Sequence, residues 1–179
     1  MISKALALVG MMGAGKSTVA KAIAIEAGCP WYDLDAEIEE TVGQDVASIF
    51  QTQGEAAFRQ YEAAALQRLL TTRRPPFVVA TGGGTPLLED NRRLLRSACW
   101  VAWLDAPAEV LFERAWSPTR PLTQGGWPTF EALARERRQL YESVAHGQFT
   151  VAHVSPTEVA HQIVAWWKSV GREGDIDGT

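Results

Sequence analysis

Gly10-Met11-Met12-Gly13-Ala14-Gly15-Lys16-Ser17-Thr18 is the stretch that decides the fold of this chain. It fits the pattern G-x-x-x-x-G-K-[ST], in which backbone N–H groups of a glycine-rich loop surround phosphate oxygens. The apolar run 5–9 predicts a buried strand before the loop, and the Ala/Ile-rich run 19–27 predicts a helix after it that ends at Gly28. A strand, a glycine loop and a helix N-terminus in this order predict a binding site for a nucleoside triphosphate.

The loop supplies the expected nucleotide contacts: Gly13, Ala14, Gly15, Lys16, Ser17 and Thr18. Lys16 is expected to reach the phosphates, and the Ser17 hydroxyl is expected to ligate Mg²⁺. The alternative is an ordinary glycine turn before a helix. Because glycine makes up only about 7% of residues in an average protein, the complete pattern in this context rarely arises by accident.

Composition sets the broad class. The 179 residues suffice for one well-buried domain, and 46% hydrophobic with 21% charged residues is typical of a globular protein. The net charge of −4 argues against non-specific binding of nucleic acid. Cys29 and Cys99 lack metal-ligand spacing and are interpreted as reduced thiols. With neither a signal-peptide pattern nor a long apolar run, we expect a cytoplasmic protein without membrane contact, and a monomer by default.

Apolar strands alternate with helices along the chain, which predicts an α/β fold with a parallel sheet covered on both faces. Further strands are expected at 31–34, 77–80, 100–104 and 149–154, and further helices at 36–42, 46–50, 55–70, 89–97, 107–114, 129–145 and 156–170. Thr129 is expected to cap the first of the last two helices, and a capping box of Ser155 and Glu158 the second.

Two segments lie outside these elements. Residues 116–128 hold three prolines and two glycines and are expected to form an exposed, mobile loop. Residues 171–179 are expected to be a flexible tail, so that the single domain covers residues 1–170.

Ligands of parallel sheets bind outside the carboxyl ends of the strands, and this rule selects further residues. Asp33 and Asp35 follow the second strand and, two residues apart in extended backbone, should project to the same side. One carboxylate can hold Mg²⁺ or its waters while the other orients or deprotonates an attacking hydroxyl. The alternative is that Asp35 simply caps the next helix, and the residues alone do not decide between the two.

Two arginines and a run of glycines are further candidates. Arg59 can bind a substrate carboxylate, although ion pairs with Glu55 or Glu62 on a solvated helix face are the simpler interpretation. Gly82-Gly83-Gly84 follows a buried strand, so the backbone there must approach something closely or adopt positive φ. Arg120 in the proline-rich loop can fold over the triphosphate and neutralise its charge, although a single loop arginine is usually solvated.

A run of basic residues lies on the expected helix 129–145. Arg135, Arg137 and Arg138 share one face of that helix and its flanks. Most such runs are solvated, but one of the three can turn toward the strand ends as a second carboxylate clamp.

Together these motifs resemble the shikimate kinase family. The glycine loop, Asp33-Leu34-Asp35, Gly54-Glu55-x-x-Phe58-Arg59, the triple glycine, Arg120-Pro121-Leu122 and Arg137-x-x-x-Tyr141 carry the resemblance, which runs from about residue 5 to about residue 168. It implies a nucleoside-monophosphate-kinase-like fold with a five-stranded parallel sheet in order 2-3-1-4-5. It also implies transfer of the ATP γ-phosphate to the 3-hydroxyl of shikimate, a step toward chorismate and the aromatic amino acids.

The resemblance assigns roles by matched position. Asp35 contacts the reacting hydroxyl as base or orienter, and Arg59 and Arg137 bind the carboxylate of shikimate. Gly83 hydrogen-bonds the ring hydroxyls, and Gly82 beside it is a further substrate contact. Ser17 ligates Mg²⁺ and Asp33 acts through water. Lys16 and Arg120 neutralise phosphate charge, and Arg114 packs near adenine.

Some alternatives stay open. The segment between Arg114 and Arg120 is shorter than in the family pattern, residues 151–156 lack a basic residue near adenine, and Arg138 rather than Arg137 can be the clamp. A related kinase of another hydroxy acid, such as gluconate, is one rival. A non-catalytic nucleotide-binding module is another, although Lys16, Asp35 and Arg120 are all present.

Overall fold

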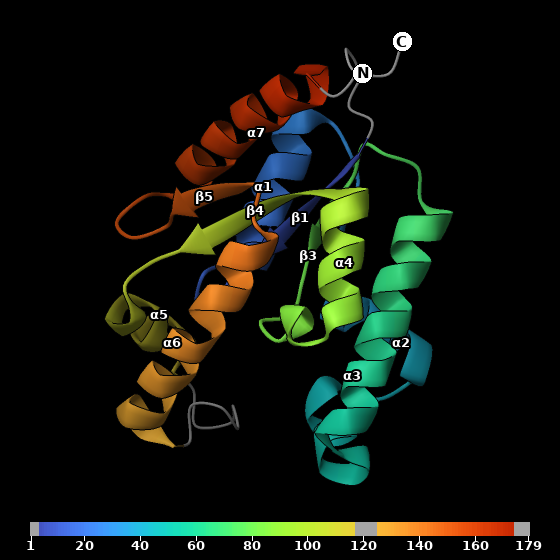
Figure 1. Ribbon diagram of the computed structural model, residues 1–179, viewed down its shortest axis with the longest axis vertical. Helices are drawn as coiled ribbons and strands as arrows, with labels where there is room; N and C mark the ends of the chain where they lie inside the picture. Colours follow the sequence, from blue (N-terminus) through green and yellow to red (C-terminus); the bar gives the residue numbers. More distant parts are fainter. Residues whose placement is uncertain (1–3, 117–124, 174–179) are drawn as a thin grey trace.

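A sheet of five parallel strands in the order β2-β3-β1-β4-β5 organises the molecule (Figure 1). The computed structural model describes residues 4–116 and 125–173. The strands are β1 Ala5–Val9, β2 Trp31–Asp33, β3 Val78–Ala80, β4 Cys99–Asp105 and β5 Gly147–Thr150. The predicted α/β class, the parallel sheet and its strand order are confirmed.

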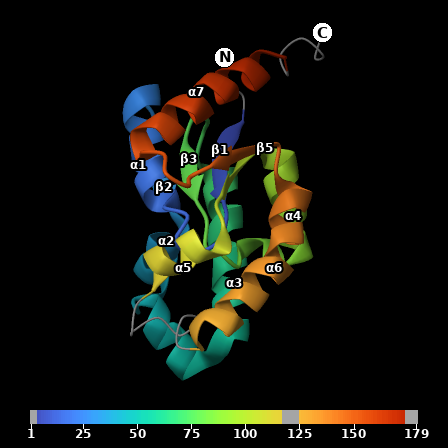
Figure 2. The same ribbon diagram turned by 90° about the vertical axis from the view of Figure 1, so that its left-hand side faces the viewer.

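Helices cover both faces of the sheet. They are α1 Lys16–Ala27, α2 Leu34–Val42, α3 Val46–Thr72, α4 Glu89–Ala98, α5 Ala108–Ala115, α6 Gly126–Val144 and α7 Pro156–Glu173, with a short 3-10 turn η1 at Thr85–Leu87. Figure 2 shows three layers, with α1 and α7 on one side of the sheet and α4 and α6 on the other.

The core follows from the apolar strands that the sequence places between the helices. Every residue of β1 and β3 is buried, as a strand in the middle of a doubly covered sheet must be. Trp167 of α7, Phe77 before β3 and Phe130 of α6 are the largest side chains that become fully buried against it. No helix in the described ranges is long and apolar enough to cross a membrane.

The carboxyl ends of three neighbouring strands meet at one edge of the sheet. Asp33, the last residue of β2, pairs with Ala80, the last residue of β3, and Ala80 in turn pairs with Leu8 of β1. Thr81 then donates both its backbone N–H and its hydroxyl to the carbonyl of Leu8, at 3.1 and 2.8 Å. The segments after β1, β2 and β3 therefore start side by side, as the strand-end rule predicts.

One long helical segment stands where two helices were expected. Within α3, Gly54 has φ 85° and ψ 170°, which kinks the helix in its first half. The part before the kink is capped by Asp45, whose carboxylate accepts the N–H of Ser48 at 2.8 Å. Across the kink, the rings of Phe50 and Phe58 pack with their centroids 4.6 Å apart.

Three predicted boundaries are wrong. Helix α6 begins at Gly126, inside the segment expected as loop, and Thr129 does not cap it because its hydroxyl donates to the carbonyl of Gly125 at 3.0 Å. Strand β5 ends at Thr150 because its partner β4 ends at Asp105, the residue it pairs with. Helix α7 continues beyond Gly171, which is buried.

The start of α7 is as predicted. The hydroxyl of Ser155 accepts the N–H of Glu158 at 3.2 Å, and the Glu158 carboxylate accepts the N–H of Ser155 at 3.1 Å. These reciprocal bonds form the capping box that the sequence indicates.

Candidate active site

The glycine loop between β1 and α1 has a backbone that only glycine adopts readily. Gly10, Gly13 and Gly15 have φ values of 145°, 84° and 78°. A side chain at Gly10 would also place its Cβ 2.5 Å from the carbonyl oxygen of Leu104, and one at Gly13 would collide with the carbonyl of Leu111. The loop is therefore packed closely against the end of β4 and against α5.

Lys16 is the first residue of α1 and folds back across this loop. Its Nζ donates to the carbonyl oxygens of Gly10 at 2.8 Å and Met11 at 3.1 Å. The first turn of α1 carries no acidic side chain. The positive end of the helix and the lysine ammonium thus lie at the same place, which is the arrangement that favours bound phosphate.

Ser17 and Asp33 join α1 to the end of β2. The Ser17 hydroxyl donates to Oδ2 of Asp33 at 2.5 Å, while Oδ1 of Asp33 accepts the N–H of Asp35 at 3.1 Å. Asp33 is therefore the N-cap of α2, the role that the sequence left open for Asp35.

A hydroxyl and a carboxylate beside a phosphate-binding loop fit Mg²⁺. This ion prefers oxygen ligands, and in nucleotide sites it is usually held by one or two protein groups together with phosphates and water. Within residues 4–116 and 125–173, no three His, Cys, Asp or Glu side chains gather as a complete metal cage. The donor set of Ser17 and Asp33 therefore suits a metal that arrives with the nucleotide.

Asp35 is a largely buried carboxyl group in the first turn of α2. The expectation that it lies in extended backbone is wrong, because the chain turns helical at Leu34. Its Oδ1 has no hydrogen-bond partner in the described part of the chain. Burial, together with the nearby Asp33 and Glu62 carboxylates and against the opposing charge of Lys16, raises the pKa of Asp35 to about 6. Such a group is poised to accept a hydrogen bond or a proton.

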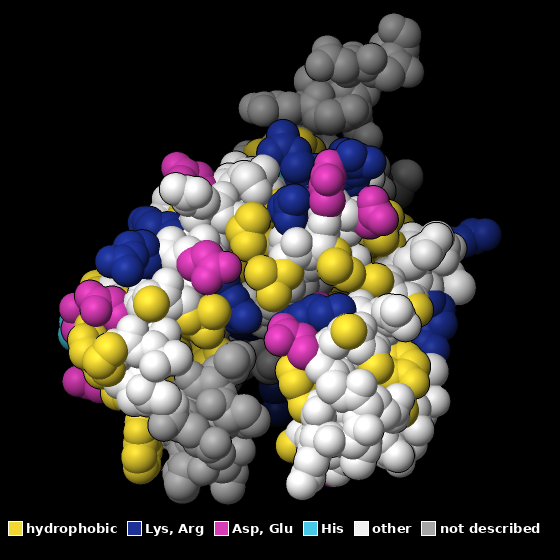
Figure 3. Space-filling model, turned by 60° about the horizontal axis from the view of Figure 1, so that its bottom comes forward, with side chains coloured by type: hydrophobic (Ala, Val, Ile, Leu, Met, Phe, Trp, Pro, Cys, Tyr) yellow, Lys and Arg dark blue, Asp and Glu magenta, His cyan; other side chains and the backbone are white. Residues whose placement is uncertain are grey.

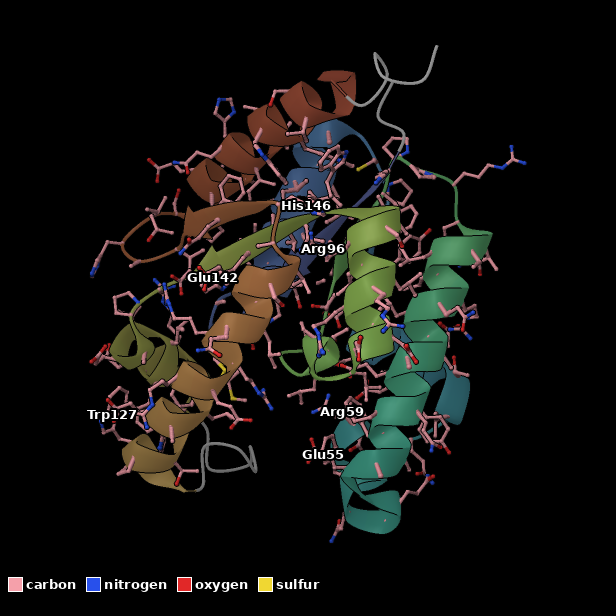
Figure 4. All side chains as sticks on the ribbon, in the orientation of Figure 1. Glu55, Arg59, Arg96, Trp127, Glu142 and His146 are labelled. Atoms are coloured by element: carbon pink, nitrogen blue, oxygen red, sulfur yellow. The ribbon has the colours of Figure 1, made fainter. Side chains whose placement is uncertain are left out.

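Arg59 lies on α3, after the kink, and makes both ion pairs that the sequence suggested. Its guanidinium bonds Glu62 at 2.9 Å and Glu55 at 3.0 Å. The face is not solvated, however, because only 12% of the Arg59 side chain is exposed. Figure 4 shows Arg59 and Glu55 together on the side of α3 that faces α6.

Glu62 anchors Arg59 from the protein interior. It is fully buried, and the oxygen that does not bind Arg59 accepts the hydroxyl of Thr85 at 2.6 Å. Thr85 in turn donates its N–H to the carbonyl of Gly82 at 3.2 Å, and its own carbonyl accepts the side chain of Asn91 from α4 at 3.0 Å. The guanidinium of Arg59 is thereby held in one place relative to the triple glycine.

The three glycines after β3 differ in what surrounds them. None has a positive φ, so the close-approach interpretation of the sequence applies and the alternative does not. A Cβ at Gly82 would lie 2.6 Å from the Glu62 carboxylate, and one at Gly84 only 2.5 Å from Cζ of Arg59. A Cβ at Gly83 would be at ordinary contact distance, 3.6 Å from Arg137 and 3.5 Å from the N of Met12.

Arg137 and Arg138 of α6 point in different directions. Arg137 is buried, with 4% of its surface exposed, and its guanidinium lies beside Gly83. Arg138 forms a two-pronged ion pair with Asp105 at 3.0 and 3.2 Å and stacks over the ring of Trp103. The geometry therefore brings Arg137, and not Arg138, toward the triple glycine and Arg59.

The remaining predicted site residues lie on the other side of the nucleotide loop or outside the described ranges. Arg114, in the last turn of α5, donates to the carbonyl of Val151 at 3.0 Å and so links α5 to the segment after β5. Arg120 falls within residues 117–124, outside the described residues.

Comparison with known proteins bears on this arrangement. The family model described as shikimate kinase matches residues 12–168. The shikimate kinase of Symbiobacterium thermophilum is 37% identical over 94% of this chain and 99% of its own length. The chain belongs to the shikimate kinase family.

Solved structures of the family have the same fold. The shikimate kinase of Acinetobacter baumannii in complex with shikimate superposes with a TM-score of 0.87 at 34% identity, over 93% of each chain. A gluconokinase of Sinorhizobium meliloti superposes with a TM-score of 0.59 at 17% identity, covering 99% of each chain, and shares the fold alone.

The candidate site of this family member is a hollow at the carboxyl edge of the sheet. Figure 3 shows the surface indented between the part that holds α3 and the part that holds α5 and α6, with Lys and Arg side chains along the hollow. Three of the predicted side chains lie along the triple glycine, with Asp35 beside Gly82, Arg137 beside Gly83 and Arg59 beside Gly84. The charge of Lys16 acts on Asp35, so four different helices contribute to the site.

Two members of the site were missed from the sequence. Glu62 was treated only as a surface partner of Arg59, and Tyr141, whose hydroxyl donates to the carbonyl of Gly83 at 2.6 Å, only as part of a motif. A signal for Glu62 exists in its spacing, since it lies four residues after Phe58 and four before Leu66, both buried on the apolar face of α3. A charged side chain on such a face must have buried partners.

Proposed function

We propose that the protein transfers the γ-phosphoryl group of ATP to the 3-hydroxyl of shikimate, giving shikimate 3-phosphate and ADP. One observation carries this proposal. Two inward-facing guanidinium groups, those of Arg59 and Arg137, lie against consecutive glycines at the edge of the nucleotide loop. Two planar cations around one small space suit a compact carboxylic acid, because each can bind a carboxylate through two parallel hydrogen bonds.

The acid would be held by its carboxylate. Arg137 is buried and its Nε finds no hydrogen-bond partner among the described residues, so it has unused capacity to bind an anion. Arg59 is oriented by Glu55 and Glu62 before the acid binds, which lowers the entropy lost on binding. Gly83, without a side chain, leaves the ring of the acid free to lie against the backbone, whereas the space beside Gly82 is taken by the Glu62 carboxylate.

Asp35 would act on the hydroxyl. With a pKa of about 6, its carboxyl is mostly ionised at pH 7 and can accept the hydrogen of the attacking hydroxyl. In the transfer, the hydroxyl oxygen bonds to the γ-phosphorus, the bond to the leaving ADP oxygen breaks, and the hydroxyl proton passes to Asp35. Phosphoryl transfer depends chiefly on positioning and charge neutralisation, so orientation of the hydroxyl is as important as removal of its proton.

The phosphates would occupy the loop formed by residues 10–18, with the N–H groups of Gly13, Gly15, Ser17 and Thr18 available to them, whereas the N–H of Ala14 donates to the carbonyl of Met11 at 3.2 Å. Lys16 would exchange its contacts with the Gly10 and Met11 carbonyls for phosphate oxygens. Ser17 and Asp33 would hold Mg²⁺, which supplies positive charge to the phosphates. We assign Arg120 to phosphate charge and Arg114 to the adenine side on the strength of the family resemblance.

A coupled assay of ADP release tests the proposal. The protein is incubated with MgATP and shikimate, with MgATP and gluconate, and with MgATP alone. ADP release that requires shikimate is the expected result. Release with gluconate alone would move the protein to a sister activity, and no release with either acid despite measurable ATP binding would make it a non-catalytic nucleotide-binding protein.

A further inference from the structure

The hydroxyl of Tyr141 holds a peptide that belongs to the acid site. Tyr141 lies on α6, one turn after Arg137, and only 2% of it is exposed. Its hydroxyl donates to the carbonyl oxygen of Gly83 at 2.6 Å and lies 3.7 Å from the sulfur of Met11. One side chain of α6 therefore reaches both the triple glycine and the nucleotide loop.

Gly83 is placed where the two substrates must meet. The position that a Cβ would take at Gly83 is 3.5 Å from the N of Met12, 3.6 Å from the carbonyl oxygen of Gly10 and 3.6 Å from Nη1 of Arg137. The nucleotide-loop backbone and the buried guanidinium are thus both within contact distance of one position at Gly83. A glycine peptide has wide conformational freedom, so its orientation needs an external restraint.

We propose that Tyr141 is a positioning residue that fixes the Gly83 peptide for binding of the acid. This proposal rests on the proposed function, because it takes the acid to lie between Arg59, Arg137 and Gly83. By binding the carbonyl of Gly83, the Tyr141 hydroxyl turns the rest of that peptide toward the acid and keeps it in register with Arg137. Tyr141 itself does not touch the reacting atoms.

A purely structural role for Tyr141 predicts something different. The ring packs against Trp103, with centroids 6.1 Å apart, and fills the core beside Met11. Phenylalanine preserves this packing and removes only the hydroxyl. If packing were the whole role, Tyr141→Phe would leave the affinity for both substrates unchanged.

The test compares Tyr141→Phe with Tyr61→Phe. Tyr61 is a matched control because its hydroxyl also donates one hydrogen bond, to the side chain of Gln53 at 2.8 Å, on the surface of α3. Steady-state rates are measured with shikimate varied at saturating MgATP, and then with MgATP varied at saturating shikimate. The thermal unfolding midpoint of each variant is recorded as well.

For Tyr141→Phe we expect the KM for shikimate to rise about 5-fold to 10-fold, as loss of one hydrogen bond allows, with the KM for ATP and kcat changed less than about 2-fold. Tyr61→Phe should match the wild type in all three. Because KM does not depend on how much of the enzyme is folded, the difference between the change in KM for shikimate and the change in KM for ATP can be measured even if Tyr141→Phe is less stable.

Unchanged KM values in Tyr141→Phe would overturn the positioning role, as would equal changes for both substrates or an equal rise in Tyr61→Phe. The wild-type enzyme, measured alongside, separates failure of the Tyr141 proposal from failure of the proposed function. If the wild type releases no ADP with shikimate, the proposed function fails, whereas a wild-type-like Tyr141→Phe in an active series rejects the role of Tyr141 alone.

Discussion

Alanine at Gly82 or Gly84 should lower the stability of the fold, whereas alanine at Gly83 should leave stability intact and weaken binding of the acid. At Gly82 the new Cβ would lie 2.6 Å from the carboxylate of Glu62, and at Gly84 2.5 Å from Cζ of Arg59. Neither neighbour can move away freely, because Glu62 is bonded to Thr85 and Arg59, and Arg59 to two carboxylates. Gly82→Ala and Gly84→Ala should each lower the free energy of unfolding by about 1–3 kcal/mol, the usual cost of overpacking.

Gly83→Ala should instead fold normally. Its Cβ would meet its neighbours at 3.5–3.6 Å and its φ is not positive, so neither packing nor backbone strain opposes the methyl group. Loss of freedom in the unfolded chain can even stabilise the variant by about 0.4–1 kcal/mol. The methyl would, however, occupy the space between Arg137 and the nucleotide loop, and one misplaced carbon in a fitted pocket costs about 10-fold or more in affinity.

Two assays separate these effects. Thermal unfolding should show midpoints several degrees lower for Gly82→Ala and Gly84→Ala, at about 2–4 °C per kcal/mol for a chain of this size, and no loss for Gly83→Ala. Steady-state kinetics should show a KM for shikimate raised at least about 10-fold in Gly83→Ala, with the KM for ATP nearly unchanged. A Gly83→Ala enzyme with wild-type kinetics would refute the placement of the acid at this glycine.

Three other substitutions test the assigned roles. Asp35→Asn should abolish most turnover. It should also raise the free energy of unfolding at pH 7 by about 2–3 kcal/mol, at about 1.4 kcal/mol per pK unit, because the folded pKa of about 6 exceeds the ordinary 3.8. The folded wild type binds the proton more tightly than the unfolded chain, so its stability falls as pH rises from about 4 to about 6. Unfolding measured as a function of pH should therefore show that the stability gained in Asp35→Asn vanishes below about pH 4. Lys16→Ala should collapse turnover at saturating substrates in the ADP-release assay, and near-normal rates would reject its role on the phosphates. Arg59→Ala should weaken binding of shikimate far more than binding of ATP. It should also destabilise the fold, because the buried Glu62 carboxylate loses its arginine partner. The double variant Arg59→Ala/Glu62→Gln should regain stability in unfolding experiments without regaining affinity for the acid in calorimetric titration.

Local patterns in the sequence predict the nucleotide side of the site well. The glycine loop, the buried run of β1 and the helix after it lie next to one another in the chain, so a local pattern is enough to predict them. The capping box at Ser155 and the end of α1 at Gly28 are equally local. In these last two cases the residues that interact are within about four positions of one another, where backbone geometry fixes the distances.

The acid side could be predicted only in part, because its contacts join distant segments. The residues cannot tell Arg137 from Arg138 until the partner of each is known, and Asp105, which binds Arg138, is 33 positions away. The same holds for Glu62, which bonds Thr85 23 positions on. Whether Asp35 caps α2 stays undecided from the sequence, and the structure makes Asp33 the cap, because the strand end and the helix start meet at Asp33 and Leu34. The sheet order, in turn, came from the family resemblance and not from the strands themselves.

Arg137 points into the acid site while Arg138, the next residue of α6, pairs with Asp105, and this difference limits where residues can be added to or removed from the chain. Successive helical residues are about 100° apart around the axis, so either change between Gly126 and Arg137 would turn the buried cation outward. One residue deleted there would bring Arg138 into the buried position and break its ion pair with Asp105, whereas one residue inserted there would bring Glu136 in. In both cases the carbonyl of Gly83 would lose the Tyr141 hydroxyl. Insertions and deletions should therefore be selected against within α6, between Gly126 and Arg137.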